Sequence, residues 1–324
     1  MSFPYNAYLA AFVSALATTL ATLPFWRRWC LRVGLVDDPG HRKIHDRPIP
    51  LAGGLAVLTG LLVPLVGAAA LLTIGSSHIA GAGELLYGLR VRALQLGAIV
   101  MGAVGIVVLG WLDDKHELRP LAKFAGQAFI AALVAATGVR ITLFVPNLAF
   151  SYFITILWLL TVINAFNFMD NMNGLCAGLG VIGAGLLAAI AAANGQYLVA
   201  LIALLAGGAL LGFLPHNFPK ATTFLGDSGS HLVGYLLAVL AILPHFYSDT
   251  NRRPWAVITP LLVLAVPLSD LAWVVLLRWR LGKPFYLGDT NHLSHRLVRA
   301  GLTPTVAVVL IWLAAALIGG LALL

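Results

Sequence analysis

The chain has 324 residues, of which 60% are hydrophobic and only 10% are charged, and its mean hydropathy is +0.94. This composition excludes a soluble globular protein, because many apolar runs approach the roughly 20 residues that a helix needs to cross a bilayer. The net charge of +8 comes without a basic soluble surface interleaved with aromatic side chains, which favours lipid headgroups or phosphates over nucleic acid as partners.

The apolar runs predict an all-α, polytopic membrane helix bundle that forms a single domain over residues 1–324. Ten runs are expected to cross the membrane. They cover residues 5–25, 51–73, 93–112, 122–137, 149–163, 175–193, 196–213, 230–246, 255–277 and 303–324. The first run is expected to be a spanning helix and not a signal peptide, because its basic residues follow it. Cys30 and Cys176 are too few for a disulfide scaffold and are expected to be free thiols.

The basic residues predict how the bundle is oriented. Of the 20 Lys and Arg residues, only five lie near the loops after the second, fourth, sixth and eighth runs: Arg90, Arg92, Arg140, Arg252 and Arg253. The positive-inside tendency therefore places the other five loops in the cytoplasm and both termini outside. These cytoplasmic loops also hold five polar motifs, which can form one site because they share one face of the membrane.

The first two cytoplasmic loops each allow two interpretations. Residues 36–54 combine turn-forming Pro and Gly with basic side chains and His45, so this loop is either an anchor that reaches lipid phosphates or a clamp for an anionic ligand. Asp113 and Asp114 are adjacent at a helix end, an unfavourable placement unless a cation or hydrogen bonds offset it. They form either a solvated helix end or a metal or general-base pair, with Lys123 as a phosphate ligand.

The third loop contains a short polar break between two apolar runs. It is predicted to begin at Asn164 and to include Asn167, Asp170 and Asn173 before Gly174. Asn and Gly tolerate turn geometry, so the break can be an ordinary turn between helices. Polar side chains at the edge of a membrane are also costly unless they face water, protein or a ligand, which makes the same break a candidate site.

The last two cytoplasmic loops carry a carboxylate and a histidine pair. Asp227 lies in a Gly-Asp-Ser-Gly turn that opens the eighth run, where it can cap a helix or serve a phosphate and Mg²⁺ site. His292 and His295 are one helical turn apart and precede Arg296, so they can contact a diphosphate or be interfacial histidines. Zinc is disfavoured, because the sequence offers no third ligand nearby.

Taken together, the motifs supply carboxylates, amides and cations, which is the set of groups used in phosphoryl transfer. Neither a Ser–His–Asp arrangement nor a Walker A loop occurs. At the cytoplasmic edge of a bundle, such a site could receive a lipid phosphate from the bilayer and a soluble partner from the cytoplasm.

The order of the motifs resembles that of the polyprenyl-phosphate N-acetylhexosamine-1-phosphate transferases. The motifs are Asp113-Asp114, Asn-x-x-Asn-x-x-Asp at 164–170, Phe-Leu-Gly-Asp-Ser-Gly at 224–229 and His-x-x-His-Arg-Leu at 292–297. The resemblance runs from about residue 34 to residue 300. It implies transfer of a hexosamine-1-phosphate from a UDP-sugar to undecaprenyl phosphate, with release of UMP, at the start of cell-envelope polysaccharide synthesis. It also implies an active site on the cytoplasmic face of the cell membrane and Mg²⁺ as cofactor, with Mn²⁺ as a compatible substitute.

The resemblance assigns roles to individual residues. It implies that Asp227 is the principal metal ligand, with Asp170 beside it, and that Asp113 and Asp114 orient or deprotonate the lipid phosphate. His292 would contact the donor diphosphate. The remaining substrate-binding positions are His45, Lys123, Asn164, Asn167, Asn173, His295 and Arg296.

Four positions depart from the usual pattern of this family. Asn171 stands where the family usually has Gly, and Asn173 where a second acid is common. In the C-terminal motif, Thr290 replaces an Arg and Ser294 replaces the middle His. The resemblance implies that the region of Asn171 and Asn173 borders the nucleotide, so the identity of the donor sugar stays open.

Two other classes of protein are weighed against the transferase. A transporter would place acids near the centres of its spans, whereas only Asp270 lies within a run, and near its cytoplasmic end. A non-catalytic protein that binds lipid phosphates would explain the basic loop but not the four acids gathered beside it. The apolar bundle is compatible with a homodimer, although no stretch of sequence marks an interface.

Overall fold

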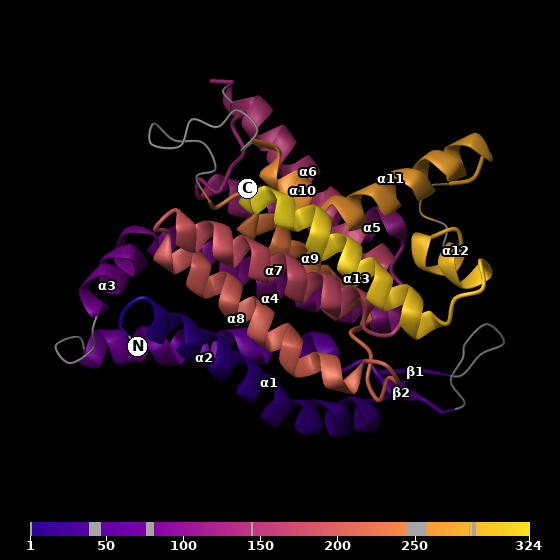
Figure 1. Ribbon diagram of the computed structural model, residues 1–324, viewed down its shortest axis with the longest axis horizontal. Coiled ribbons are helices and arrows are strands. Elements are labelled where there is room, and N and C mark those ends of the chain that lie inside the picture. The colour runs from indigo at the N-terminus through magenta and orange to yellow at the C-terminus, as the bar shows by residue number, and fades with distance from the viewer. Residues whose placement is uncertain are drawn as a thin grey trace.

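The computed structural model describes residues 2–38, 47–75, 81–143, 145–244, 257–284, 286 and 290–324. The described residues form a bundle of helices with one short hairpin (Figure 1). Among the described residues, seven helices are long and apolar enough to cross a membrane. They are α1 (Tyr5–Val33), α2 (Gly53–Gly75), α4 (Ala93–His116), α6 (Leu148–Met169), α7 (Leu175–Ala193), α8 (Tyr197–Phe213) and α13 (Pro304–Gly320). The expected all-α membrane architecture is therefore confirmed.

Helices α8 and α13 reach this length together with the 3-10 turns that follow them, and the other described elements are shorter. Three of the predicted runs correspond to α5 (Pro120–Ala136), α9 (Gly226–Leu240) and the consecutive pair α10 (Thr259–Val263) and α11 (Ala265–Arg280). The remaining elements are α3 (Ala82–Val91), α12 (Leu293–Arg299), the 3-10 turns η2 (Leu214–His216) and η4 (Leu321–Leu323), and the strands β1 (Val36–Asp37) and β2 (Ile49–Pro50). The strands pair antiparallel, with Val36 opposite Pro50. Each of the ten predicted runs overlaps one helix or two consecutive helices.

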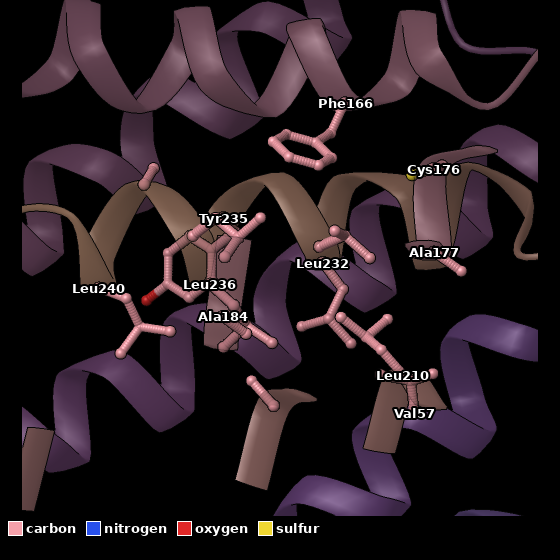
Figure 2. Close-up of a cluster of buried hydrophobic side chains, with 14 of the residues drawn as sticks. Val57, Phe166, Cys176, Ala177, Ala184, Leu210, Leu232, Tyr235, Leu236 and Leu240 are labelled. Carbon is pink, nitrogen blue, oxygen red and sulfur yellow. The ribbon is translucent and has the colours of Figure 1, made fainter. Parts of the chain in front are cut away.

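Helix α9 forms the centre of the bundle. Every residue from Ser228 to Leu240 is buried, and the helix contacts α2, α4, α6 and α7. Figure 2 shows Leu232, Tyr235 and Leu236 of this helix among side chains of its neighbours. The Tyr235 hydroxyl donates a hydrogen bond to the Ile99 carbonyl at 2.9 Å, so the polar end of this buried ring is satisfied. From Leu232 to Leu240 the helix is apolar apart from the Tyr235 hydroxyl, as expected of a helix enclosed on all sides.

The start of α9 is held close to α4 by a glycine. At Gly110, an added Cβ would lie 2.5 Å from the Cα of Ser228. Only a residue without a side chain therefore allows the two backbones to approach this closely. This contact places the last turn of α4 against the first turn of α9.

Gly110→Ala is expected to destabilise the protein by about 2 kcal/mol, because the added methyl group would push α9 away from α4. Gly97 lies on the same helix and has no atom within 4 Å of the corresponding position. Gly97→Ala is therefore expected to be neutral, or stabilising by up to about 1 kcal/mol through helix propensity. Thermal unfolding in detergent compares the two variants. Equal Tm values would contradict the close contact between α4 and α9.

The polar break predicted from Asn164 onward is shorter than expected. Helix α6 continues to Met169, so Asn164 and Asn167 lie in its last two turns and only Asp170–Gly174 form the connection to α7. The prediction was wrong at this boundary because both amides find hydrogen-bond partners on other helices. Polar side chains with such partners need not end a helix at the membrane edge. Cys30 and Cys176 are both buried and free, as predicted.

Candidate active site

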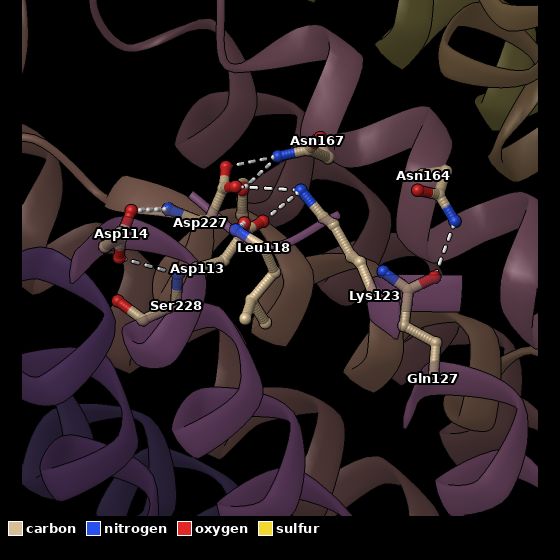
Figure 3. A network of polar contacts seen from close by, with 10 residues as sticks. Asp113, Asp114, Leu118, Lys123, Gln127, Asn164, Asn167, Asp227 and Ser228 are labelled. Carbon is tan, nitrogen blue, oxygen red and sulfur yellow. Dashed lines mark hydrogen bonds and ion pairs between the residues drawn. The ribbon is translucent and has the colours of Figure 1, made fainter. Parts of the chain in front are cut away.

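A lysine and two carboxylates from three helices form the centre of the site (Figure 3). The Lys123 ammonium nitrogen lies 2.6 Å from Asp113 Oδ2 and 2.8 Å from Asp227 Oδ2. These residues come from the end of α4, the start of α5 and the start of α9. Two carboxylates this close repel one another unless a cation offsets their charge. Lys123, predicted to bind a phosphate, supplies that cation here.

The two adjacent aspartates of α4 serve different partners. Asp113 Oδ1 accepts a hydrogen bond from the Leu118 backbone N–H at 2.9 Å, while its other oxygen contacts Lys123. Asp114 instead accepts from the backbone N–H groups of Asp227 at 2.7 Å and Ser228 at 3.1 Å. The turn at Gly226–Gly229 was expected to present backbone N–H groups to a phosphate. Two of these N–H groups instead donate hydrogen bonds to Asp114. A carboxylate at a helix N-terminus also interacts favourably with the helix dipole.

The Gly226 backbone makes room for Asp114. Its φ is +69°, and an added Cβ would lie 2.7 Å from Asp114 Oδ2. Glycine is thus required twice at this position, by the left-handed backbone and by the close carboxylate. The Gly-Asp-Ser-Gly sequence consequently binds the Asp114 carboxylate of α4 in addition to forming a turn.

The two amides at the end of α6 reach different neighbours. Asn167 Nδ2 donates to Asp227 Oδ1 at 2.7 Å and to the Ser230 hydroxyl at 3.0 Å. Asn164 Nδ2 donates to Gln127 Oε1 at 2.7 Å, and Figure 3 shows this pair set apart from the carboxylates. Asn167 therefore belongs to the carboxylate cluster, whereas Asn164 joins α6 to α5.

The connection after α6 holds Asp170, the fourth carboxylate of the candidate site. Burial, followed by the negative charges of Asp227 and Asp114, raises the pKa of the Asp170 carboxyl to about 8. Asn173 points elsewhere, since its Nδ2 donates to the Pro219 carbonyl at 3.2 Å. The structure thus gives Asn173 a role in holding this connection against the segment after α8.

His292 is held by a carboxylate that the motif analysis did not assign to the site. Asp270 of α11 is 3% exposed, and its Oδ2 lies 2.6 Å from His292 Nδ1. Its Oδ1 accepts from the Leu293 backbone N–H at 2.6 Å. Asp270 therefore fixes both the start of α12 and the orientation of the imidazole. Its position as an isolated acid near the end of an apolar run was the available signal.

The other residues of the C-terminal motif surround this histidine. The rings of His292 and His295 have their centroids 6.4 Å apart, although His292 is the extended residue that precedes α12 and only His295 lies within the helix. The guanidinium of Arg296, predicted to bind substrate, lies 4.8 Å from the centroid of the Trp273 ring. Phe168 of α6 packs edge-on against His292, with centroids 5.4 Å apart. His45, the remaining predicted substrate ligand, lies outside the described residues.

The oxygen atoms around Lys123 fit a hard cation. Mg²⁺ takes oxygen ligands and usually needs only one or two protein carboxylates, with water and substrate phosphates completing its shell. Asp113 and Asp227 supply two carboxylates, with a cationic group already between them. Within the described part of the chain, no three His, Cys, Asp or Glu side chains form a complete metal site. A bound Mg²⁺ would therefore depend on the substrate for further ligands.

Comparison with known proteins identifies relatives of this chain. The sequence model of glycosyl transferase family 4 matches residues 96–245, which include the carboxylate cluster. The chain is 33% identical over 313 residues to a probable undecaprenyl-phosphate N-acetylglucosaminyl 1-phosphate transferase of Bacillus subtilis, covering 94% of this chain and 81% of the relative. It is 33% identical over 331 residues to a decaprenyl-phosphate N-acetylglucosaminephosphotransferase of Mycobacterium tuberculosis, covering 94% and 79%.

A third relative extends the comparison to Escherichia coli K12. Its undecaprenyl-phosphate alpha-N-acetylglucosaminyl 1-phosphate transferase is 30% identical over 321 residues, covering 96% of this chain and 82% of the relative. The fold and site define a multi-pass membrane protein with a carboxylate-rich centre. The chain belongs to glycosyl transferase family 4, and the resemblance inferred from its motifs is confirmed.

Proposed function

We propose that this protein transfers N-acetylglucosamine-1-phosphate, or a closely related hexosamine-1-phosphate, from a UDP-sugar to undecaprenyl phosphate or another polyprenyl phosphate. An oxygen of the lipid phosphate forms a bond to the sugar-bound phosphorus. The bond from that phosphorus to the oxygen bridging to UMP breaks, and its electron pair leaves with UMP. Direct attack is favoured because the acceptor is already an anionic nucleophile. The product would start a cell-envelope polysaccharide.

The cluster of Asp113, Lys123 and Asp227 is the observation that carries this proposal. When bound, Mg²⁺ would neutralise charge on the donor diphosphate. Asp113 and Asp227 would hold the ion, while Asn167 keeps the Asp227 carboxylate in place. Once the ion balances these carboxylates, Lys123 can turn toward the phosphates, which is the role predicted from the sequence. His292, oriented by Asp270, would meet the diphosphate from the side of α12.

The proposed topology has ten spans, both termini outside and the site at the cytoplasmic face of the cell membrane. The site residues lie at the C-terminal ends of α4 and α6 and the N-terminal ends of α5, α9 and α12. The ends of α4, α5, α6 and α9 meet through the contacts of Asp114, Lys123, Asn167 and Asp227. A transporter is not favoured, because the named relatives are phosphate transferases. A homodimer remains part of the proposal.

UMP release tests the function directly. Purified protein in detergent, supplied with Mg²⁺, undecaprenyl phosphate and a panel of UDP-sugars, is expected to release UMP only when both lipid and one donor are present. UDP-N-acetylglucosamine is the expected donor. Folded protein that releases no UMP with any donor would favour a non-catalytic relative that binds lipid phosphates.

The raised pKa of Asp170 predicts a pH dependence. Its folded-state pKa, about 8, lies above the ordinary value of 3.8, so the folded protein favours the protonated carboxyl. The free energy of unfolding that this group contributes is therefore lost as the pH rises from about 4 toward 8. Without divalent cation, Tm is expected to fall between pH 5 and 8. Mg²⁺ should stabilise more at pH 8 than at pH 6, because binding beside Asp170 releases its proton. Asp170→Asn should flatten both trends, and a variant with wild-type pH dependence would contradict the assignment.

A further inference from the structure

Two positions at which this chain departs from its family contact each other. The Ser294 hydroxyl donates a hydrogen bond to Asn171 Oδ1 at 2.6 Å, across 123 residues of sequence. Ser294 is fully buried, whereas Asn171 is partly exposed. A glycine at 171 could not make it, and a histidine at 294 would bring a ring into a space filled by a hydroxymethyl group. The two departures are therefore compatible with each other as a pair.

The Asn171 side chain is fixed at both ends of its amide. While Oδ1 accepts from Ser294, Nδ2 donates to the Phe168 carbonyl at 2.6 Å. Phe168 in turn packs against the His292 ring. Asn171 thus joins the end of α6 to α12 through two side-chain hydrogen bonds. A displacement of the end of α6 would therefore also displace α12.

The bond connects the segments that carry two predicted site residues. Asn171 follows Asp170 directly, and Ser294 is two residues after His292. Helix α12 has only seven residues, too short to be stable without tertiary contacts. Asp270 holds the first residues of this helix, and Asn171 holds it from the opposite segment.

We infer that Asn171 and Ser294 form a positioning pair, here called the Asn171–Ser294 clasp, that sets the spacing between Asp170 and His292 for the diphosphate of the nucleotide donor. This inference rests on the proposed function. The clasp acts through Asp170 and His292 and does not itself need to touch the donor.

A double-mutant cycle tests the clasp. Asn171→Ala, Ser294→Ala and the double variant are compared by calorimetric titration with UDP in the presence of Mg²⁺, and by the KM values for donor and acceptor. Each single change is expected to raise the UDP Kd and the donor KM about fivefold, the equivalent of one lost hydrogen bond. The double variant should be no weaker than Asn171→Ala, because both lack the Ser294 bond and the bond from Asn171 Nδ2 to the Phe168 carbonyl. The acceptor KM should change by less than about twofold.

Control variants separate the clasp from general loss of stability. Ser151 lies at the end of α6 that is far from the site, and Ser151→Ala also removes a buried hydroxyl. This hydroxyl donates a hydrogen bond to the Ile141 carbonyl at 2.8 Å. Asn194→Ala removes an amide that donates to the Ile190 carbonyl at 2.9 Å. Neither control should change the UDP Kd. Ser294→Cys keeps the shape of the side chain but replaces the hydroxyl with a larger and weaker donor, so it should lose the bond as Ser294→Ala does.

The outcomes distinguish the clasp from the proposed function. Additive effects of the two substitutions, or wild-type UDP affinity with a lowered Tm, would overturn the clasp even if wild-type protein releases UMP. Coupled losses of UDP affinity in a protein that releases no UMP would uphold the clasp and refute the transferase. A folded wild-type protein that neither binds UDP nor releases UMP would overturn both.

Discussion

Asp227→Asn is expected to lower kcat for Mg²⁺-dependent UMP release by about 10³-fold while leaving the protein folded. The carboxylate of Asp227 contacts Lys123 through one oxygen and Asn167 through the other. An amide carries no charge for a cation, and its NH₂ group would face either the Lys123 ammonium or the Asn167 amide. The measurement is the initial rate of UMP release at saturating donor and acceptor, together with Tm in the same detergent.

Glu84→Gln is the matched control for this experiment. It makes the same change from acid to amide on the exposed surface of α3. Its kcat should stay within about twofold of wild type, since surface substitutions usually have small effects. Near-normal turnover of Asp227→Asn would remove Asp227 from the metal site and leave the proposed chemistry without its central carboxylate.

Asp114→Asn is expected to reduce both stability and turnover, which separates it from Asp227→Asn. Asp114 accepts hydrogen bonds from two backbone N–H groups at the start of α9. An asparagine offers one oxygen to these donors and turns its NH₂ group toward the other. Loss of one charge-assisted hydrogen bond should cost about 2 kcal/mol. The displaced α9 should also lower kcat by about 10²-fold, because it carries Asp227.

Thermal unfolding and UMP release, measured on the same preparations, test this distinction. Hydrogen exchange at the Asp227 and Ser228 amides should become faster in Asp114→Asn and stay slow in Asp227→Asn. An Asp114→Asn protein with wild-type Tm and slow exchange would show that the contact to α9 contributes nothing to stability. Loss of turnover without loss of stability would instead support the role predicted from the sequence, in which Asp114 orients or deprotonates the lipid phosphate.

The conspicuous motifs did not reveal all of their own partners. Asp113 and Asp114 are adjacent in sequence, yet one contacts a lysine ammonium and the other the backbone of another helix. Asn164 and Asn167 belong to one motif but bind Gln127 and Asp227, respectively. Side-chain types and spacing indicate which groups can take part in a site. They do not indicate which neighbour each group meets, because that depends on how the helices pack.

The sequence by itself determined the membrane class, the approximate positions of the helices and the family. Long apolar runs must be helical in lipid, where each backbone N–H and C=O needs a partner within the segment. The order of four motifs was enough to indicate the transferases. Only the tertiary structure decided that α6 continues past Asn167, that Asp270 holds His292, and that Asn171 meets Ser294. These contacts join residues up to 123 positions apart, and a local pattern cannot specify them because they arise from the packing of separate helices.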